Sequence, residues 1–328
     1  MSHLNAVIDL DDIDRGLIAA LSADGRAAMG ELGARVGLSG DAVRERLRRL
    51  QRDGVVSVVG TPDPAALGYH TVALVGVRVR GPVAPVAAQI AEVAEVDLLT
   101  MTFGEFELLA EVLAHDEEHL LELLDERIRA LPAVVGCSVF LYLGVLKWAP
   151  GGLATVQPPN GAAPPAARLD DTDRALLREL QRDGRASFQD LATATGLSYA
   201  HARRRAHALI ASGTVRIITT VNRVATGGAV MAAVGLRVAG PVDRVVAGLG
   251  EIAEVEVAVQ TSGAFDVFVE IACRDRERLR TLVGEEIRAV EGVTASETFV
   301  YGKLLKLPVQ WSADALVGAM SAAPGSPA

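Results

Sequence analysis

The sequence is poor in the residues that build metal centres, disulfide frameworks and aromatic cores. Only 4% of its 328 residues are aromatic, and only Cys137 and Cys273 are cysteines. Each cysteine lies in an apolar stretch with too few potential ligands for a structural zinc site, so we interpret both as buried thiols. No apolar run reaches the ~18 residues of a membrane-spanning helix. The acidic start lacks the basic-then-apolar order of a secretory signal, which predicts a cytoplasmic protein.

Recognisable catalytic patterns are also missing. No Ser–His–Asp set, P-loop or glycine-rich dinucleotide fingerprint is visible. No metal-ligand spacing links the histidines His70, His115, His119, His201 and His207. We therefore predict that the chain is not an enzyme and that it uses no metal and no cofactor.

The net charge of −9 is unevenly distributed. Residues 71–150 hold twelve acidic and five basic side chains, whereas residues 169–219 hold eight basic and six acidic ones. Nucleic-acid affinity depends on a local basic surface rather than on the total charge. An acidic protein with basic segments is therefore compatible with DNA binding.

The chain contains one long internal repeat. With a constant offset of 159, residues 10–147 align without a gap with residues 169–306, and roughly two positions in five are identical. Leu10-Asp11-Asp12-Ile13-Asp14-Arg15 recurs as Leu169-Asp170-Asp171-Thr172-Asp173-Arg174, and Gly37-Leu38-Ser39 recurs as Gly196-Leu197-Ser198. Such a period is far too long for a solenoid, so we interpret it as one two-domain unit written twice.

Residues 39–54 of the first unit predict a short basic helix. Val43, Leu47 and Leu50 form its apolar face. Positions 39 to 53 contain five arginines against two aspartates and one glutamate, so the segment carries a net positive charge. Two apolar helical patterns and a glycine-containing turn precede it, which is the helix-turn-helix pattern. Val55–Val59 follows as a strand, interpreted as a wing. A simpler interpretation is a solvated charged face.

In a helix-turn-helix domain the recognition helix enters the major groove, and its N-terminal half meets base edges. The predicted DNA-binding residues of the two units are Ser39, Gly40, Asp41, Arg44, Glu45 and Arg48, and Ser198, Tyr199, Ala200, Arg203, Arg204 and His207. The outward residues of the two predicted recognition helices differ from each other at nearly every position. If both helices read DNA, they therefore read different half-sites.

The second half of each unit alternates strand and helix patterns in the order β-α-β-β-α-β, which predicts an α+β, ferredoxin-like sheet with both helices on one face. The expected boundaries are 8–60 and 169–220 for the winged helix-turn-helix domains, 69–148 and 228–308 for the sheet domains, 149–168 for a Pro/Gly-rich linker and 312–328 for a flexible tail.

This combination resembles the Lrp/AsnC family of transcriptional regulators. The likeness rests on Leu10–Arg15 with Asp24-Gly25-Arg26, on Gly37-Leu38-Ser39 with Arg46-Leu47, on Leu67-Gly68-Tyr69, and on Gly104-Glu105-Phe106-Glu107, which is similar to the family's Gly-Asp-Tyr-Asp stretch. The resemblance implies a regulator that binds double-stranded DNA, oligomerises through its sheet domains and takes small effectors, often amino acids, between them.

The resemblance also implies which residues bind the effector: Gly104, Glu105, Phe106, Glu107, Gly263, Ala264, Phe265, Asp266 and Thr298. The second loop lacks the first acidic residue, Glu107 replaces the second aspartate, and Val139 stands opposite Thr298 in the repeat. The two glycines have an alternative interpretation as plain hairpin residues.

Two other functions fit the pattern. Sirohaem decarboxylases resemble the same architecture, although the acidic sheet of unit one suits a polycarboxylate substrate poorly. The other alternative is an effector-binding protein without DNA contact.

A linker of about 20 residues gives the second unit an effective concentration near millimolar around the first. We therefore expect each chain to form its own pseudo-dimer, to read an asymmetric operator, and to assemble further into homo-oligomers.

Overall fold

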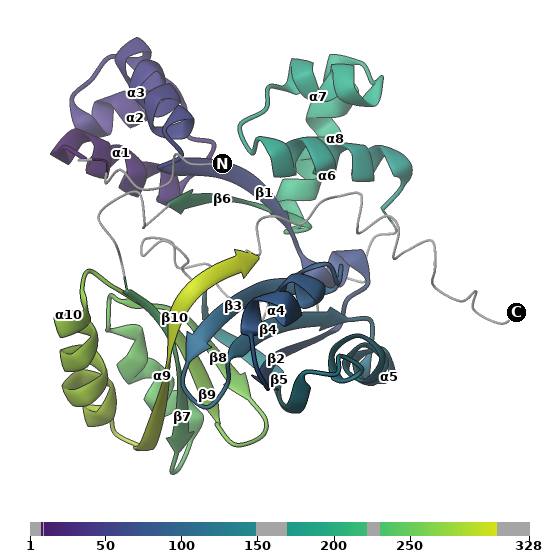
Figure 1. Ribbon diagram of the computed structural model, residues 1–328. Helices are drawn as coiled ribbons and strands as arrows, with labels where there is room; N and C mark the ends of the chain where they lie inside the picture. The colour runs from purple at the N-terminus through teal and green to yellow at the C-terminus, as the bar shows by residue number, and fades with distance from the viewer. Residues whose placement is uncertain (1–7, 9, 149–168, 222–229, 307–328) are drawn as a thin grey trace, which may run out of the picture.

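Two helix-turn-helix domains lie side by side above an eight-stranded barrel in the computed structural model (Figure 1). The structure describes residues 8, 10–148, 169–221 and 230–306. The predicted linker at 149–168 and tail at 312–328 lie outside these residues. The duplicated α+β architecture that the sequence predicts is confirmed.

Three helices open each unit. They are α1 (Asp12–Ala23), α2 (Met29–Val36) and α3 (Gly40–Arg52) in the first unit, and α6 (Asp171–Arg182), α7 (Phe188–Thr195) and α8 (Tyr199–Ala211) in the second. The Ser39 side chain accepts a hydrogen bond from the backbone N–H of Ala42 and caps α3, as expected of an N-cap serine. Gly37 ends α2 with a φ of 72°, a left-handed conformation that glycine adopts without strain.

The strand after each recognition helix pairs with the other unit. β1 (Val56–Pro62) and β6 (Val215–Val221) form a two-stranded antiparallel sheet in which Val59 lies opposite Ile218. Ile217 and Val221 of the second unit also pack against the hydrophobic core of the first helix-turn-helix domain. The strands interpreted as wings therefore join the two helix-turn-helix domains.

The sheet domains follow the predicted order. The first contains β2 (Thr71–Val79), α4 (Val83–Ala91), β3 (Val96–Phe103), β4 (Leu108–Ala114), α5 (Glu117–Leu123) with its π-helical continuation η2 (Leu124–Arg129), and β5 (Val134–Trp148). The second contains β7 (Val230–Val238), α9 (Val242–Gly250), β8 (Val255–Thr261), β9 (Val267–Cys273), α10 (Arg276–Thr281) with η3 (Leu282–Ile287), and β10 (Val293–Lys306). A 3₁₀ turn, η1 (Pro64–Leu67), precedes β2.

The two sheets close into one barrel in the order β10-β3-β4-β2-β5-β8-β9-β7. The β5–β8 and β10–β3 pairings join the units. Each sheet packs one face against its helices and turns the other inward, where aromatic side chains from both units meet. Phe299 of unit two, for example, stacks on Phe106 of unit one with ring centroids 5.5 Å apart. The chain thus forms the internal pseudo-dimer that the tethering argument predicts.

Candidate nucleic-acid interface and effector loops

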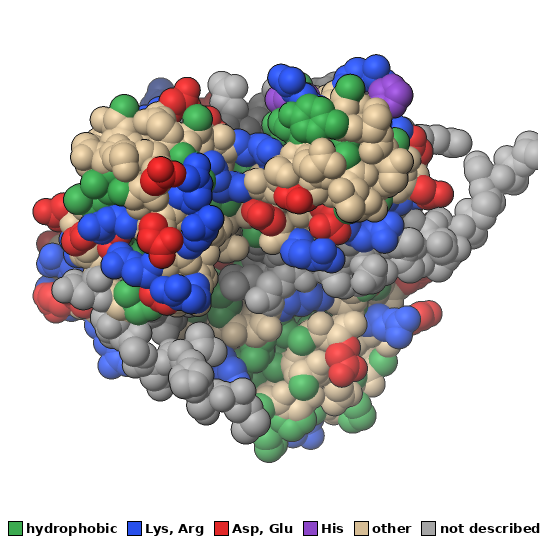
Figure 2. Space-filling view, turned by 90° about the horizontal axis from the view of Figure 1, so that it is seen from above, with side chains coloured by type: hydrophobic (Ala, Val, Ile, Leu, Met, Phe, Trp, Pro, Cys, Tyr) green, Lys and Arg blue, Asp and Glu red, His purple; other side chains and the backbone are tan. Residues whose placement is uncertain are grey.

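The predicted DNA-binding residues lie on the surfaces of α3 and α8. Val43, Leu47 and Leu50 bury the inner face of α3. The exposed predicted positions are Ser39, Asp41, Arg44, Glu45 and Arg48 in unit one, and Ser198, Tyr199, Ala200, Arg203, Arg204 and His207 in unit two, while Gly40 is half-buried. Figure 2 looks onto this side of the molecule and shows basic side chains interleaved with acidic ones, with histidine at one of the two domains.

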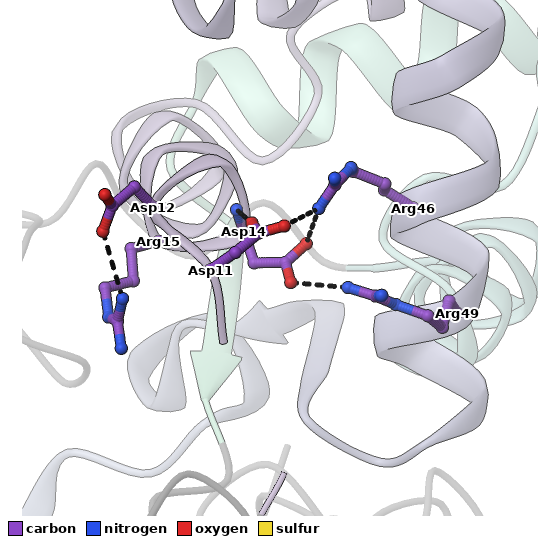
Figure 3. Close-up of polar contacts among 6 residues, drawn as sticks. All are labelled: Asp11, Asp12, Asp14, Arg15, Arg46 and Arg49. Carbon is purple, nitrogen blue, oxygen red and sulfur yellow. Dashed lines mark hydrogen bonds and ion pairs between the residues drawn. The ribbon is translucent and has the colours of Figure 1, made fainter. Parts of the chain in front are cut away.

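Two arginines of α3 are engaged inside their own domain (Figure 3). Arg46 Nη1 donates to Asp14 Oδ1 at 2.9 Å and to Asp11 Oδ2 at 2.7 Å, and Arg49 Nη2 donates to the second oxygen of Asp14. Arg205 makes the equivalent contacts in unit two. These arginines hold the recognition helix on the first helix, so the basic surface is smaller than a count of arginines suggests.

Asp14 is 1% exposed and accepts from two arginines, whereas the side chain of Asp12 is fully exposed and pairs with Arg15. Asp14→Ala removes the acceptor of Arg49 and leaves Arg46 with Asp11 alone, and we expect it to lower the free energy of unfolding by about 1–3 kcal/mol. Asp12→Ala is the matched control and should cost less than ~0.5 kcal/mol. Urea denaturation measures both, and equal losses in the two variants would refute the structural role of Asp14.

The two predicted effector loops, Gly104–Glu107 and Gly263–Asp266, each lie against the last strand of the other unit. A Cβ on Gly104 would lie 3.0 Å from Phe299 Cδ1 and 3.5 Å from the carbonyl oxygen of Thr298. A Cβ on Gly263 would lie 3.3 Å from the carbonyl oxygen of Val139. Thr298 therefore belongs with the loop of unit one, and the second loop meets Val139. Gly263 also has a φ of 116°, so a valine there would strain the turn itself.

Five of the predicted effector residues have partners within the protein itself. The rings of Phe106 and Phe265 are buried in the barrel, where they pack over Gly76 and Gly235. The carboxylates of Glu107 and Asp266 accept the backbone N–H groups of Val79 and Val238 at 2.8 and 2.7 Å. These contacts hold each loop on the end of its own sheet and occupy two carboxylates that the family resemblance assigned to effector binding. Ala264 also uses its carbonyl, which accepts from Arg237 Nε at 3.1 Å.

Charges of both signs meet at the Gly104 loop. Arg78 Nη1 lies 3.3 Å from Glu105 Oε1, and both side chains are nearly half exposed. Burial and the neighbouring Glu105 carboxylate raise the pKa of Glu297, which the Arg237 charge opposes. This junction brings the ion pair of Arg78 and Glu105 close to the carboxylate of Glu297, the neighbour of Thr298 in the sequence.

The sequence analysis did not predict a cluster of four polar side chains inside the barrel. Tyr142 donates to Glu111 at 2.7 Å and Tyr301 donates to Glu270 at 2.5 Å, and these four side chains line a cavity of ≈ 30 Å³. That volume admits one or two water molecules. The sequence did contain a signal for this cluster, because Glu111 and Glu270 occupy the same position of the repeat, each inside an apolar strand pattern.

Burial raises the pKa of the Glu270 carboxyl to about 7, although the Tyr301 hydrogen bond lowers it. Because the folded chain then holds this proton more tightly than the unfolded chain, the free energy of unfolding falls as the pH rises from about 4.5 to 7, by at most about 3 kcal/mol. Glu270→Gln should therefore be more stable than the parent at pH 8 and similar to it near pH 5. Urea denaturation across this range tests it, with Glu118→Gln on exposed α5 as control. A Glu270→Gln profile parallel to the parent's contradicts the assignment.

The interpretation of both cysteines as buried thiols holds for one of them and only in part for the other. Cys273 is buried and Cys137 is half-buried, and neither forms a disulfide. Among the described residues, no group of three or more His, Cys, Asp or Glu side chains is arranged to hold a metal ion. No helix in the described part of the chain is long and apolar enough to cross a membrane.

Family models cover most of both units. Residues 10–51 and 169–210 each match the AsnC-type helix-turn-helix domain. Residues 69–149 match a C-terminal dimeric alpha+beta barrel domain, and residues 231–308 match the Lrp/AsnC ligand binding domain. The two sheet domains thus match different models, which parallels the differences between their loops.

Similar proteins match one unit or the whole fold. The HTH-type transcriptional regulator FL11 of Pyrococcus horikoshii is 31% identical over 142 residues, which are 43% of this chain and 93% of that protein. Ptr1 of Methanocaldococcus jannaschii, another HTH-type transcriptional regulator, is 31% identical over 42% of this chain and 95% of its own. The crystal structure of the siroheme decarboxylase NirDL covers 95% of this chain and all of its own with a TM-score of 0.62, but at 15% identity this likeness shows the fold alone. The chain belongs to the Lrp/AsnC family of DNA-binding transcriptional regulators.

Proposed function

We propose that one chain binds an asymmetric operator through α3 and α8 and responds to a small zwitterion, such as an amino acid, at the Gly104 loop. The observation that carries this proposal is the joining of two unequal helix-turn-helix domains within one chain, by the β1–β6 sheet above and the closed barrel below. A symmetric dimer presents the same helix twice, whereas this chain presents two different ones.

The exposed side chains of α3 and α8 support different base preferences. Arg44 of α3 forms an ion pair with Asp41 and is followed by Glu45, whereas Arg203 and Arg204 of α8 are adjacent and exposed. An arginine fork binds guanine O6 and N7, while a glutamate accepts from cytosine N4. The two half-sites should therefore differ in sequence and lie about one DNA turn, 34–36 Å, apart.

The charged residues at the Gly104 loop favour a ligand that carries both an ammonium and a carboxylate group. Glu105 and Glu297 supply acceptors for the ammonium group, and Arg78 supplies donors for the carboxylate. The match of residues 231–308 to a ligand binding domain agrees with an effector site to which unit two contributes.

Removal of Glu105 should weaken binding of an amino acid effector by about tenfold or more, because a charge-assisted hydrogen bond contributes about 1.5–3 kcal/mol. Calorimetric titration of the chain with each of the twenty protein amino acids identifies the ligand, and Glu105→Ala is then compared with Glu118→Ala on exposed α5. Unchanged affinity in Glu105→Ala would place the effector elsewhere.

We infer that the chain is not an enzyme, despite its likeness in fold to a sirohaem decarboxylase. In the described part of the barrel, the cavity between the two Glu–Tyr pairs has the size of a water molecule or two and is lined by carboxyl groups. Neither property suits a large substrate with many carboxylates. Absorption spectra of the chain with added sirohaem test this alternative, and a shifted spectrum with loss of carboxylate groups from the sirohaem would favour the enzyme.

A further inference from the structure

The turn between the first two helices of each unit contains the repeated sequence Asp-Gly-Arg-Ala, at 24–27 and 183–186. In both copies the aspartate side chain accepts the backbone N–H of the arginine at 2.8 Å, which closes a tight local turn. The turn thus fixes the direction in which the arginine leaves the backbone.

Each arginine reaches across to the turn of the other unit. Arg26 donates from Nη1 to the carbonyl of Gly184 at 2.6 Å and from Nη2 to that of Ala186 at 3.0 Å. Arg185 donates in the same way to the carbonyls of Gly25 and Ala27, at 2.5 and 2.8 Å. We call this reciprocal set of four hydrogen bonds the arginine clasp.

The glycines of the clasp allow the two units to approach closely. The backbone N–H of Gly184 donates to the carbonyl of Val58 on β1 at 2.8 Å, and a Cβ on Gly184 would lie 2.8 Å from the carbonyl carbon of Val59. A Cβ on Gly25 would lie 2.9 Å from Ile217 on β6. A side chain at Gly184 would therefore clash with the backbone of β1, and one at Gly25 would displace side chains of both strands, so the clasp lies directly against the β1–β6 sheet.

The clasp also reaches the recognition helix of unit two. The Arg26 guanidinium lies over the ring of Phe188, 5.2 Å from its centroid. Phe188 begins α7 and contacts the rings of Tyr199 and His207 on α8, at 6.3 and 5.0 Å. A movement of Arg26 would therefore be transmitted to the helix that carries Arg203.

The clasp needs arginine rather than any cation. Each guanidinium spans two carbonyl oxygens with parallel donors, which the single ammonium group of a lysine cannot reproduce. Both groups are partly buried, and burial lowers the pKa of Arg26 and of Arg185, so each depends on its carbonyl partners to replace water. Four directional bonds leave the two domains one relative orientation.

We propose that Arg26 and Arg185 are positioning residues that set the distance between the half-sites the chain recognises. By fixing the two helix-turn-helix domains on each other, the clasp holds α3 and α8 at one separation and one relative angle. This inference rests on the proposed function, DNA binding through both helices, and adds the residues that select the operator's spacing.

The test is a set of DNA duplexes that carry both half-sites, with their distance varied in single base pairs by up to half a turn on either side of the preferred spacing. The parent chain should lose about tenfold or more in affinity at the half-turn offset, which places the half-sites on opposite faces of the duplex. Arg26→Ala/Arg185→Ala should flatten this profile to a difference below threefold, and Arg26→Lys/Arg185→Lys should flatten it as well. Arg178→Ala, an exposed arginine on α6, is the charge control and should keep the sharp profile.

Duplexes with a single half-site provide the second measurement. There the clasp variants should bind as tightly as the parent, because neither recognition helix has changed. A sharp spacing profile in both clasp variants overturns the inference, and so does an equal loss on every duplex, which would make the arginines DNA contacts or folding determinants. If the parent chain binds none of the duplexes, the proposed function itself fails, which distinguishes that outcome from failure of the clasp alone.

Discussion

Arg44→Ala should weaken binding to one half of the operator, and Arg203→Ala should weaken binding to the other half. Both side chains are exposed on the outward faces of their recognition helices. An arginine that reads a base contributes about 1–3 kcal/mol, so each substitution should lower affinity by about five- to 150-fold and relax base preference at one position.

Competition binding with operators mutated in one half-site at a time measures this effect. Arg80→Ala is the control and should change affinity little, because Arg80 is an exposed arginine just after β2, in the sheet domain. The half-site that Arg44→Ala ceases to discriminate should remain fully discriminated by Arg203→Ala. If both variants bind the intact operator as the parent does, α3 and α8 are not the recognition helices.

Phe299→Ala should lower the free energy of unfolding by about 3–5 kcal/mol. The ring is 0% exposed and lies among Phe106, Phe265 and Phe268, so its removal leaves a cavity where the two units meet. Phe103→Ala, which removes a ring that is 70% exposed, is the matched control and should change stability by less than about 0.5 kcal/mol.

Urea denaturation followed by far-ultraviolet circular dichroism measures both variants. Because Phe299 joins the two units, the barrel of Phe299→Ala should unfold in one transition at lower urea. Similar losses in the two variants would contradict the assignment of the barrel interior as the shared core.

Local sequence patterns were sufficient to predict the elements. The helical spacing of Val43, Leu47 and Leu50 and the Ser39 cap each depend on neighbouring residues, and both agree with the structure. The sheet order within a unit followed from its alternation of strands and helices. Tethering of two similar units was enough to predict that they pair within the chain.

Contacts between distant segments were harder to predict. The pairing of β1 with β6 depends on the register of two strands about 160 residues apart, which no local pattern encodes. Arg46 and Arg49 add to the basic charge of the predicted recognition helix, but their positions on α3 place them against Asp14. The roles of Glu107 and Asp266 could not be predicted either. Each carboxylate accepts a backbone N–H from a strand about 28 residues earlier in the chain, and no local pattern shows that contact.

Selection of bound sequences from a random DNA pool by the full chain tests the central claim most directly. The two recognition helices differ at most outward positions and are held in one chain by the barrel and the β1–β6 sheet. The selected operator should therefore contain two unequal half-sites, about one DNA turn apart, in a fixed order. A perfect palindrome with equal half-sites would contradict the claim that each chain acts as its own asymmetric dimer.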